Sequence, residues 1–168
     1  MRGLIAENAV ASLLNLLTLE RENLFVFHSI SEEENPVGET DHILLYKRML
    51  LIIETKNRSN ISDLKLTKDG ELIATKAGKA FTVNGNNILK KVDKYKSLYP
   101  ALDVKGVIVA HHATQTLTSE VANCNLTQLN TLIPYVLEQV DAVEKNSVDV
   151  IPIIKDIAIR CIRNENIN

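Results

Sequence analysis

The chain has 168 residues, of which 45% are hydrophobic, so it has the length of one domain and enough apolar side chains to bury a core. Its formal net charge of -2 argues against a generic basic nucleic-acid coat protein, whereas an enzyme needs only a local basic surface. Glu7 interrupts the first apolar stretch, and no apolar run approaches the ~20 residues that span a bilayer. We therefore expect a single domain over residues 1–168 that is soluble and cytoplasmic and has no membrane partner.

The first third of the chain predicts a helix followed by strands. Apolar residues recur at helical spacing over residues 3–19, and Leu24–Ile30 has the composition of a strand. Residues 31–40 combine three consecutive glutamates with a proline and a glycine, which predicts a loop. Two apolar runs, His42–Tyr46 and Met49–Thr55, are separated by two residues and predict a hairpin. The second run is apolar on both faces, as is typical of a central strand.

The rest of the chain continues to alternate between strand and helix patterns. In chain order, the sequence predicts a hairpin around residues 68–71, an edge strand at Phe81–Val83, a helix at 88–98, a strand at Val104–Ala110, and helices at 127–145 and 151–162. Pro134 lies within residues 127–145, so we expect either a kink there or a helix start nearer Ile133. This order predicts an α/β fold in which helices flank a mixed β-sheet.

Three polar residues stand at one end of the predicted central hairpin. Glu54 and Lys56 are two residues apart, so their side chains leave the same face of the sheet. If the strands pair around Lys47-Arg48, Asp41 lies near the same end. A surface ion pair between Glu54 and Lys56 is the simplest alternative. Charges that close so apolar a strand are costly, however, unless they are paired or bind a cation.

This group of residues has the donors that a hard divalent cation prefers. Mg²⁺ and Mn²⁺ take carboxylate and carbonyl oxygens, which Asp41, Glu54 and the carbonyl of Thr55 supply. A bound metal lowers the pKa of a water molecule and stabilises charge on a phosphate. Lys56 is placed to orient that water or to neutralise the developing oxyanion. The sequence therefore predicts a Mg²⁺- or Mn²⁺-dependent site for phosphodiester hydrolysis.

Glu7 lies at the centre of the apolar stripe of the first predicted helix. One interpretation is an acid tolerated near a helix start, where the helix dipole favours negative charge. The other is a carboxylate that points into the site as a third acid or as a ligand of a second metal, because glutamate is rarely buried without a partner.

These features resemble the nuclease-related domain (NERD) family. The resemblance spans residues 3–110 and rests on three segments: Gly3-Leu4-Ile5-Ala6-Glu7, Gly38-Glu39-Thr40-Asp41-His42-Ile43-Leu44-Leu45 and Leu51-Ile52-Ile53-Glu54-Thr55-Lys56-Asn57. The family belongs to the PD-(D/E)xK superfamily, so the resemblance implies a restriction-endonuclease-like fold and nuclease activity. It also implies catalytic roles for Glu7, Asp41, Glu54 and Lys56. Family members often carry a glutamine on the helix after the core strands, where this chain has Lys90 and Lys91.

Lysines are concentrated in the middle third of the chain. We expect four of them, Lys76, Lys79, Lys90 and Lys91, to contact the DNA backbone, the alternative being a solvated helix and hairpin face. The leading hypothesis is a metal-dependent endonuclease or exonuclease acting on DNA, with RNA as a further substrate class and a homodimer as one way to cut both strands. The rival is a non-catalytic nucleic-acid-binding or assembly module that kept the fold.

Overall fold

The computed structural model describes residues 2–31, 39–83, 87–112, 114–143 and 148–165. In chain order these residues form α1 (Arg2–Glu20), β1 (Leu24–Ile30), β2 (Thr40–Tyr46), β3 (Met49–Lys56), β4 (Asp63–Leu66), β5 (Leu72–Lys76), β6 (Lys79–Thr82), α2 (Ile88–Leu98), β7 (Asp103–Ala110), β8 (Thr116–Ser119), β9 (Cys124–Gln128), the 3₁₀ turn η1 (Leu129–Thr131), α3 (Leu132–Asp141) and α4 (Ile151–Glu165).

A five-stranded sheet in the order β1-β2-β3-β7-β9 forms the centre of the protein. The β1–β2 and β2–β3 pairs are antiparallel, whereas β7 pairs in parallel with β3 and with β9. β3 is central because its side chains are apolar on both faces, and Leu50, Leu51, Ile52 and Ile53 are fully buried. This mixed sheet and its flanking helices confirm the predicted restriction-endonuclease-like α/β fold.

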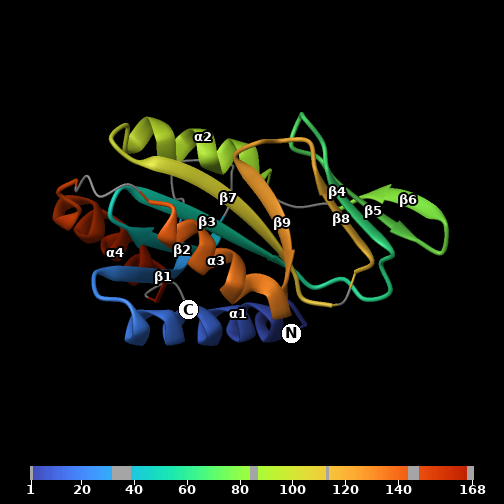
Figure 1. Ribbon diagram of the computed structural model, residues 1–168, viewed down its shortest axis with the longest axis horizontal. Helices are drawn as coiled ribbons and strands as arrows, with labels where there is room; N and C mark the ends of the chain where they lie inside the picture. Colours follow the sequence, from blue (N-terminus) through green and yellow to red (C-terminus); the bar gives the residue numbers. More distant parts are fainter. Residues whose placement is uncertain (1, 32–38, 84–86, 113, 144–147, 166–168) are drawn as a thin grey trace.

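Helices cover both faces of the central sheet (Figure 1). On one face, α1 and α3 pack through Val10, Leu14 and Val136 against the odd-numbered side chains of β3. On the other face, α2 and α4 pack against Leu50 and Ile52. By strand alternation, Asp41, Glu54 and Lys56 share this second face. None of the helices, within the residues described, has the length and apolar character needed to cross a membrane.

A second sheet, in the order β6-β5-β4-β8, extends from one side of the molecule. Its β4 and β5 strands bury Leu64, Leu66 and Leu72 in the same core as α2. The β5–β6 hairpin reaches beyond the body, with β6 exposed along its whole length (Figure 1). We call β5, β6 and their turn the arm.

Most predicted elements up to Ala110 are confirmed, and the predicted loop at 31–40 lies largely outside the described residues. Of the two outcomes expected at Pro134, the helix start nearer Ile133 is confirmed, because Gln128 still belongs to β9 and α3 begins at Leu132. The predicted end at residue 145 is wrong, since α3 ends at Asp141. Pro134 explains the late start, since proline is tolerated in the first turn of a helix and disfavoured in its interior. The strands β8 and β9 were not predicted.

Candidate active site

The β2–β3 hairpin places the predicted site residues at one end of the central sheet. Its two-residue turn contains Lys47 with a positive φ of 51°, and the strand register ends at His42 opposite Ile53. Beyond that pair, the backbone N–H of Thr55 donates a hydrogen bond to Oδ2 of Asp41 at 2.7 Å. The Asp41 side chain therefore accepts the hydrogen bond that a backbone carbonyl would accept in a regular β-ladder, and this contact fixes the Asp41 carboxylate beside β3.

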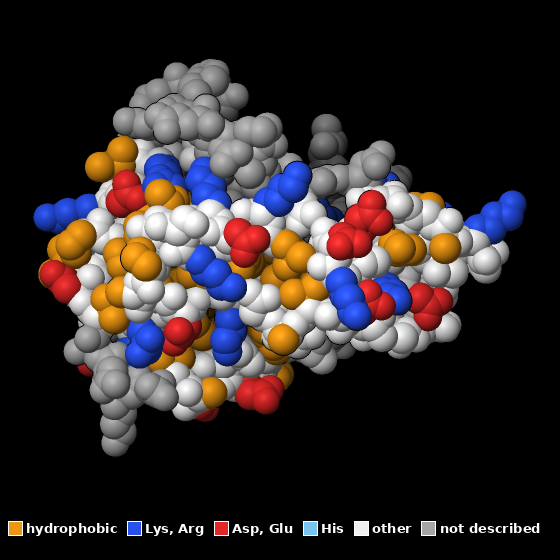
Figure 2. Space-filling model, turned by 90° about the horizontal axis from the view of Figure 1, so that it is seen from above, with side chains coloured by type: hydrophobic (Ala, Val, Ile, Leu, Met, Phe, Trp, Pro, Cys, Tyr) orange, Lys and Arg blue, Asp and Glu red, His pale blue; other side chains and the backbone are white. Residues whose placement is uncertain are grey.

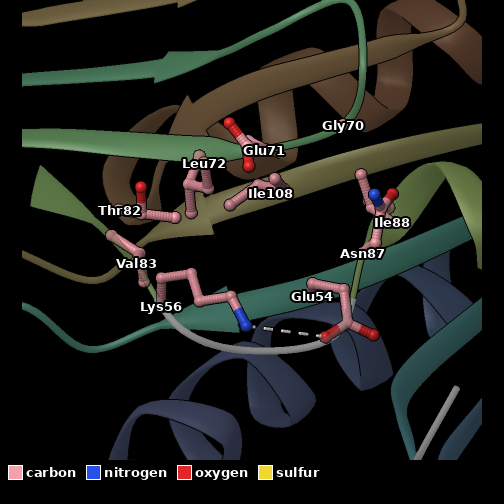
Figure 3. Close-up of a pocket in the computed structure, with 10 residues that line it drawn as sticks. All are labelled: Glu54, Lys56, Gly70, Glu71, Leu72, Thr82, Val83, Asn87, Ile88 and Ile108. Carbon is pink, nitrogen blue, oxygen red and sulfur yellow. Dashed lines mark ion pairs between the residues drawn. The ribbon is translucent and has the colours of Figure 1, made fainter. Parts of the chain in front are cut away.

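Glu54 is buried between two lysines, with only 2% of its surface exposed. Nζ of Lys91, on α2, contacts Oε1 of Glu54 and also donates to the backbone carbonyl of Glu39 at 2.6 Å. Nζ of Lys56 lies 3.9 Å from Oε2 of Glu54, and Figure 3 shows this ammonium directed toward the carboxylate. The two oxygens of Glu54 therefore face different ammonium groups.

Burial and neighbouring carboxylates raise the pKa values of two acids in the site, Glu54 and Glu7. Burial and the charge of Asp41 raise the pKa of Glu54 to about 7, although Lys91 and Lys56 act in the opposite direction. Burial, followed by the charges of Asp41 and Glu39, also raises the pKa of Glu7, whereas Lys56 lowers it. Glu7 is thus half-buried beside the same group of charges, although α1 packs on the other face of the sheet.

A pocket of about 200 Å³ opens beside Glu54 and Lys56. Its walls come from β3, β7, the start of α2 and the β4–β5 hairpin (Figure 3). Asn87 caps α2 by accepting bonds from the N–H groups of Leu89 and Lys90, and its Nδ2 donates to the carbonyl of Asp69 at 3.1 Å. This residue therefore joins the turn that lines the pocket to the helix that carries Lys91.

The structure brings Asp41, Glu54 and Lys56 together, as the hairpin register predicted. It separates the four lysines that we expected to contact DNA. Lys76, Lys79 and Lys90 are exposed, but Lys91 is 1% exposed and contacts Glu54, so its predicted place on a surface track is wrong.

Sequence reasoning missed that Lys91 belongs to the site, although its position in the sequence gave a signal of burial. It follows Ile88 by three residues and precedes Tyr95 by four, which places it on the apolar stripe of α2. The same argument had drawn attention to Glu7. A lysine so buried requires a compensating group, and Glu54 is that group.

His42 lies on the opposite face of the sheet, in agreement with its alternation in β2. Its Nδ1 is 2.8 Å from Nδ1 of His28, whose Nε2 in turn lies 3.0 Å from Oδ1 of Asn15 on α1. Burial, aided by His28, lowers the pKa of His42 to about 3, so the ring is neutral at pH 7. This pair belongs to the packing under α1 and not to the acidic group.

The donor set at the hairpin end fits a hard divalent cation. In the part of the chain that the structure describes, no three His, Cys, Asp or Glu side chains are grouped to hold a metal, so the side chains here suit a cation such as Mg²⁺ that is bound by two carboxylates and keeps several waters. The N–H of Thr55 faces β2, and because N–H and C=O of one strand residue point the same way, its carbonyl also faces β2. After burial, the charge of Asp41 is the second cause that raises the pKa of Glu54, so the two acids repel each other, and a cation relieves this repulsion.

Comparisons with known proteins identify the family. Neither the curated proteins nor the solved structures give a match to this chain. The family model described as nuclease-related domain matches residues 2–112, which is well over half of the chain and includes Glu7, Asp41, Glu54, Lys56 and Lys91. The chain therefore belongs to the nuclease-related domain (NERD) family, and its function is nuclease-related.

Proposed function

We propose that this protein is a divalent-metal-dependent nuclease of the PD-(D/E)xK type that hydrolyses DNA phosphodiester bonds. The observation that carries the proposal is a pair of carboxylates on adjacent strands. Glu54 is buried and lines a pocket, and Asp41 is fixed beside β3 by a backbone N–H. Two acids held this close have little structural use, since their repulsion destabilises the fold, but they suit a cation.

Asp41, Glu54 and the carbonyl of Thr55 would hold Mg²⁺ or Mn²⁺. When bound, the metal supplies a more acidic water and stabilises negative charge on the phosphate. Lys56 lines the pocket, so its ammonium is available to a phosphate oxygen or to the attacking water. Glu7 lies beside this group and would act as a further acid that holds or orients a water molecule.

Lys91 neutralises Glu54 from within the protein. Its ammonium contacts Oε1 of Glu54 and is anchored by the carbonyl of Glu39, so it holds the carboxylate in one orientation. Because Lys91 is almost fully buried, this positioning role suits it better than direct contact with DNA.

A non-catalytic nucleic-acid-binding module is the second candidate, and the same ion pair favours it. The Lys91 ammonium beside Glu54 provides part of the positive charge that a metal would otherwise supply, as expected of a domain that keeps the nuclease fold without catalytic activity. The two candidates differ in whether a divalent metal binds at Asp41 and Glu54.

The test is cleavage of supercoiled plasmid, linear duplex DNA and single-stranded RNA in Mg²⁺ or Mn²⁺, with EDTA as the control. The proposal expects metal-dependent cleavage of DNA that Glu54→Gln abolishes. Asp141→Asn is the matched control, because it removes a carboxylate charge from the exposed surface of α3. DNA binding without cleavage under every metal condition would favour the second candidate.

A further inference from the structure

Assuming the proposed action on DNA, we infer that the arm is a second DNA contact, which binds the phosphate backbone at a fixed distance from the catalytic pocket. The arm is the β5–β6 hairpin that extends from the body of the protein (Figure 1). Figure 2 shows a basic side chain at the far end of the molecule on the side where the arm extends.

One face of the arm continues the wall of the pocket. Leu72 and Val83 line the pocket, and the N–H of Val83 donates to the carbonyl of Leu72 at 2.7 Å. Two residues farther along each strand, Phe81 lies opposite the buried Ala74. Because side chains alternate along a strand, the pair Leu72 and Val83, the pair Ala74 and Phe81, and the next pair toward the turn all lie on one face of the hairpin. A substrate that leaves the pocket along this wall therefore meets the side chains of the arm.

The outermost row of this face consists of two lysines. Lys76 pairs directly with Lys79 across the Ala77-Gly78 turn, and both side chains are exposed. Like charges at directly opposed positions destabilise a hairpin. Neither lysine forms an ion pair within the part of the chain described here. A bound phosphate offsets this repulsion.

Two other lysines near this sheet, Lys65 and Lys68, lie beside the carboxylate of Glu120. Lys65 forms an ion pair with Glu120 at 2.5 Å, and the backbone N–H of Lys68 donates to the same carboxylate at 3.1 Å. Lys65 also alternates with the buried Leu64 and Leu66, so it points away from the pocket face. Of the three lysines on strands of this sheet, Lys65 is thus paired with an acid, whereas the two at the end of the arm have no ion pair among the residues described.

Phe81 provides a further contact for DNA. It stands between the pocket wall and the lysine pair, and 38% of its surface is exposed on an edge strand. An exposed aromatic ring has little to gain from solvent, whereas it can stack on a base or lie against a sugar. A lysine pair and an adjacent aromatic ring are the combination that proteins use along a nucleic-acid strand.

The spacing of these groups sets a substrate length. Lys76 lies four residues beyond Leu72, a rise of about 13 Å along an extended strand. Phosphates along one strand of B-DNA rise by about 3.4 Å each, so the arm lies roughly four base pairs from the pocket. DNA that ends within about three base pairs of the pocket does not reach the lysine pair.

The experiment compares the double variant Lys76→Ala/Lys79→Ala with a matched control, Lys65→Ala/Lys68→Ala, in the full chain. DNA affinity is measured by fluorescence anisotropy in EDTA over a series of salt concentrations, and thermal melts confirm folding. Removing two phosphate contacts should lower the slope of log affinity against log salt by about two, whereas the control keeps the wild-type slope. On a hairpin-closed duplex of about three base pairs, which is too short to reach from the pocket to the lysine pair, the arm variant and the wild type should bind equally well.

The outcomes separate this inference from the proposed function. If the wild-type protein binds and cuts long DNA but the arm variant retains its salt slope, the arm is not a contact and only this inference fails. If the wild-type protein binds DNA without cutting it, the nuclease proposal fails, and the slope still decides the role of the arm. If the wild-type protein binds no DNA, both are overturned.

Discussion

Among single residues, Glu54 has the most unusual environment. It is buried, the charge of Asp41 adds to burial in raising its pKa, and each of its oxygens has an ammonium neighbour. The hairpin register was enough to predict that Asp41, Glu54 and Lys56 meet. The partnership with Lys91 was not predicted, because it depends on how α2 crosses the sheet, and local periodicity carries no information about that crossing.

The first prediction concerns pH. Because the folded state raises the pKa of Glu54 from 4.5 to about 7, its contribution to stability is full below about pH 4.5 and is lost as the pH rises through 7. A shift of this size corresponds to roughly 3 kcal/mol. The measurement is urea denaturation in EDTA of the wild type and Glu54→Gln between pH 4.5 and 8. The free energy of unfolding of the wild type should fall relative to that of the variant. A difference that stays constant with pH would contradict the assignment.

The second prediction separates the two lysines. Lys56→Ala should lower turnover by orders of magnitude while calorimetry still detects metal binding, because this ammonium faces the pocket. Lys56→Arg should restore little activity, since a planar guanidinium does not replace a compact ammonium. The comparison variant is Lys91→Gln, which removes the buried charge and should alter metal affinity as well as turnover. If Lys56→Ala abolished metal binding too, Lys56 would instead be positioning the carboxylates.

The third prediction concerns Glu7. Since burial and the charges of Asp41 and Glu39 raise its pKa, Glu7→Gln should leave the metal-free protein as stable as the wild type or more stable. If Glu7 acts in catalysis, the same change should strongly reduce DNA cleavage in Mg²⁺. Glu20→Gln, at the exposed far end of α1, is the control. A Glu7→Gln variant that is slightly less stable and fully active would remove Glu7 from the site.

At the scale of elements, the sequence predicted those with strong periodicity and missed those without it. The apolar runs of β3 and β7 and the stripe of α2 lie close to their predicted bounds. β8 has the sequence Thr-Leu-Thr-Ser and β9 has Cys-Asn-Leu-Thr-Gln, so neither contains the apolar run of a central strand. These two strands are specified by partners distant in sequence, since β8 pairs with β4 and β9 with β7.

The fourth prediction tests how the pocket turn and α2 are joined. Asn87→Ala removes both the cap of α2 and the bond to the carbonyl of Asp69, and should cost about 1–2 kcal/mol of stability. Asn87→Ser keeps a capping oxygen and loses only the turn contact, so it should cost less. Chemical denaturation measures both costs, and cleavage assays report whether Lys91 keeps its place. Equal costs for the two substitutions would show that the cap contributes nothing.

For the whole molecule, the structure combines a central sheet covered by helices with an extended arm. The acids and lysines of the candidate site lie where the central sheet, α2 and the β4–β5 turn meet, and the arm continues from there. The sequence predicted the α/β class correctly, but not the second sheet as a unit, because β8 joins the consecutive strands β4, β5 and β6 from a distant part of the chain. A single domain over residues 1–168 and a homodimer both stay predictions.

The central claim is that Asp41 and Glu54 bind a divalent metal, and isothermal titration calorimetry with Mn²⁺ at pH 8 tests it most directly. At this pH, above the pKa of Glu54, little binding energy is spent on releasing a proton. The account predicts binding to the wild type and to the control Asp141→Asn, and no binding to Asp41→Asn or Glu54→Gln, with all four proteins folded by thermal melt. Equal binding to all four proteins, or no binding to the wild type, would contradict it.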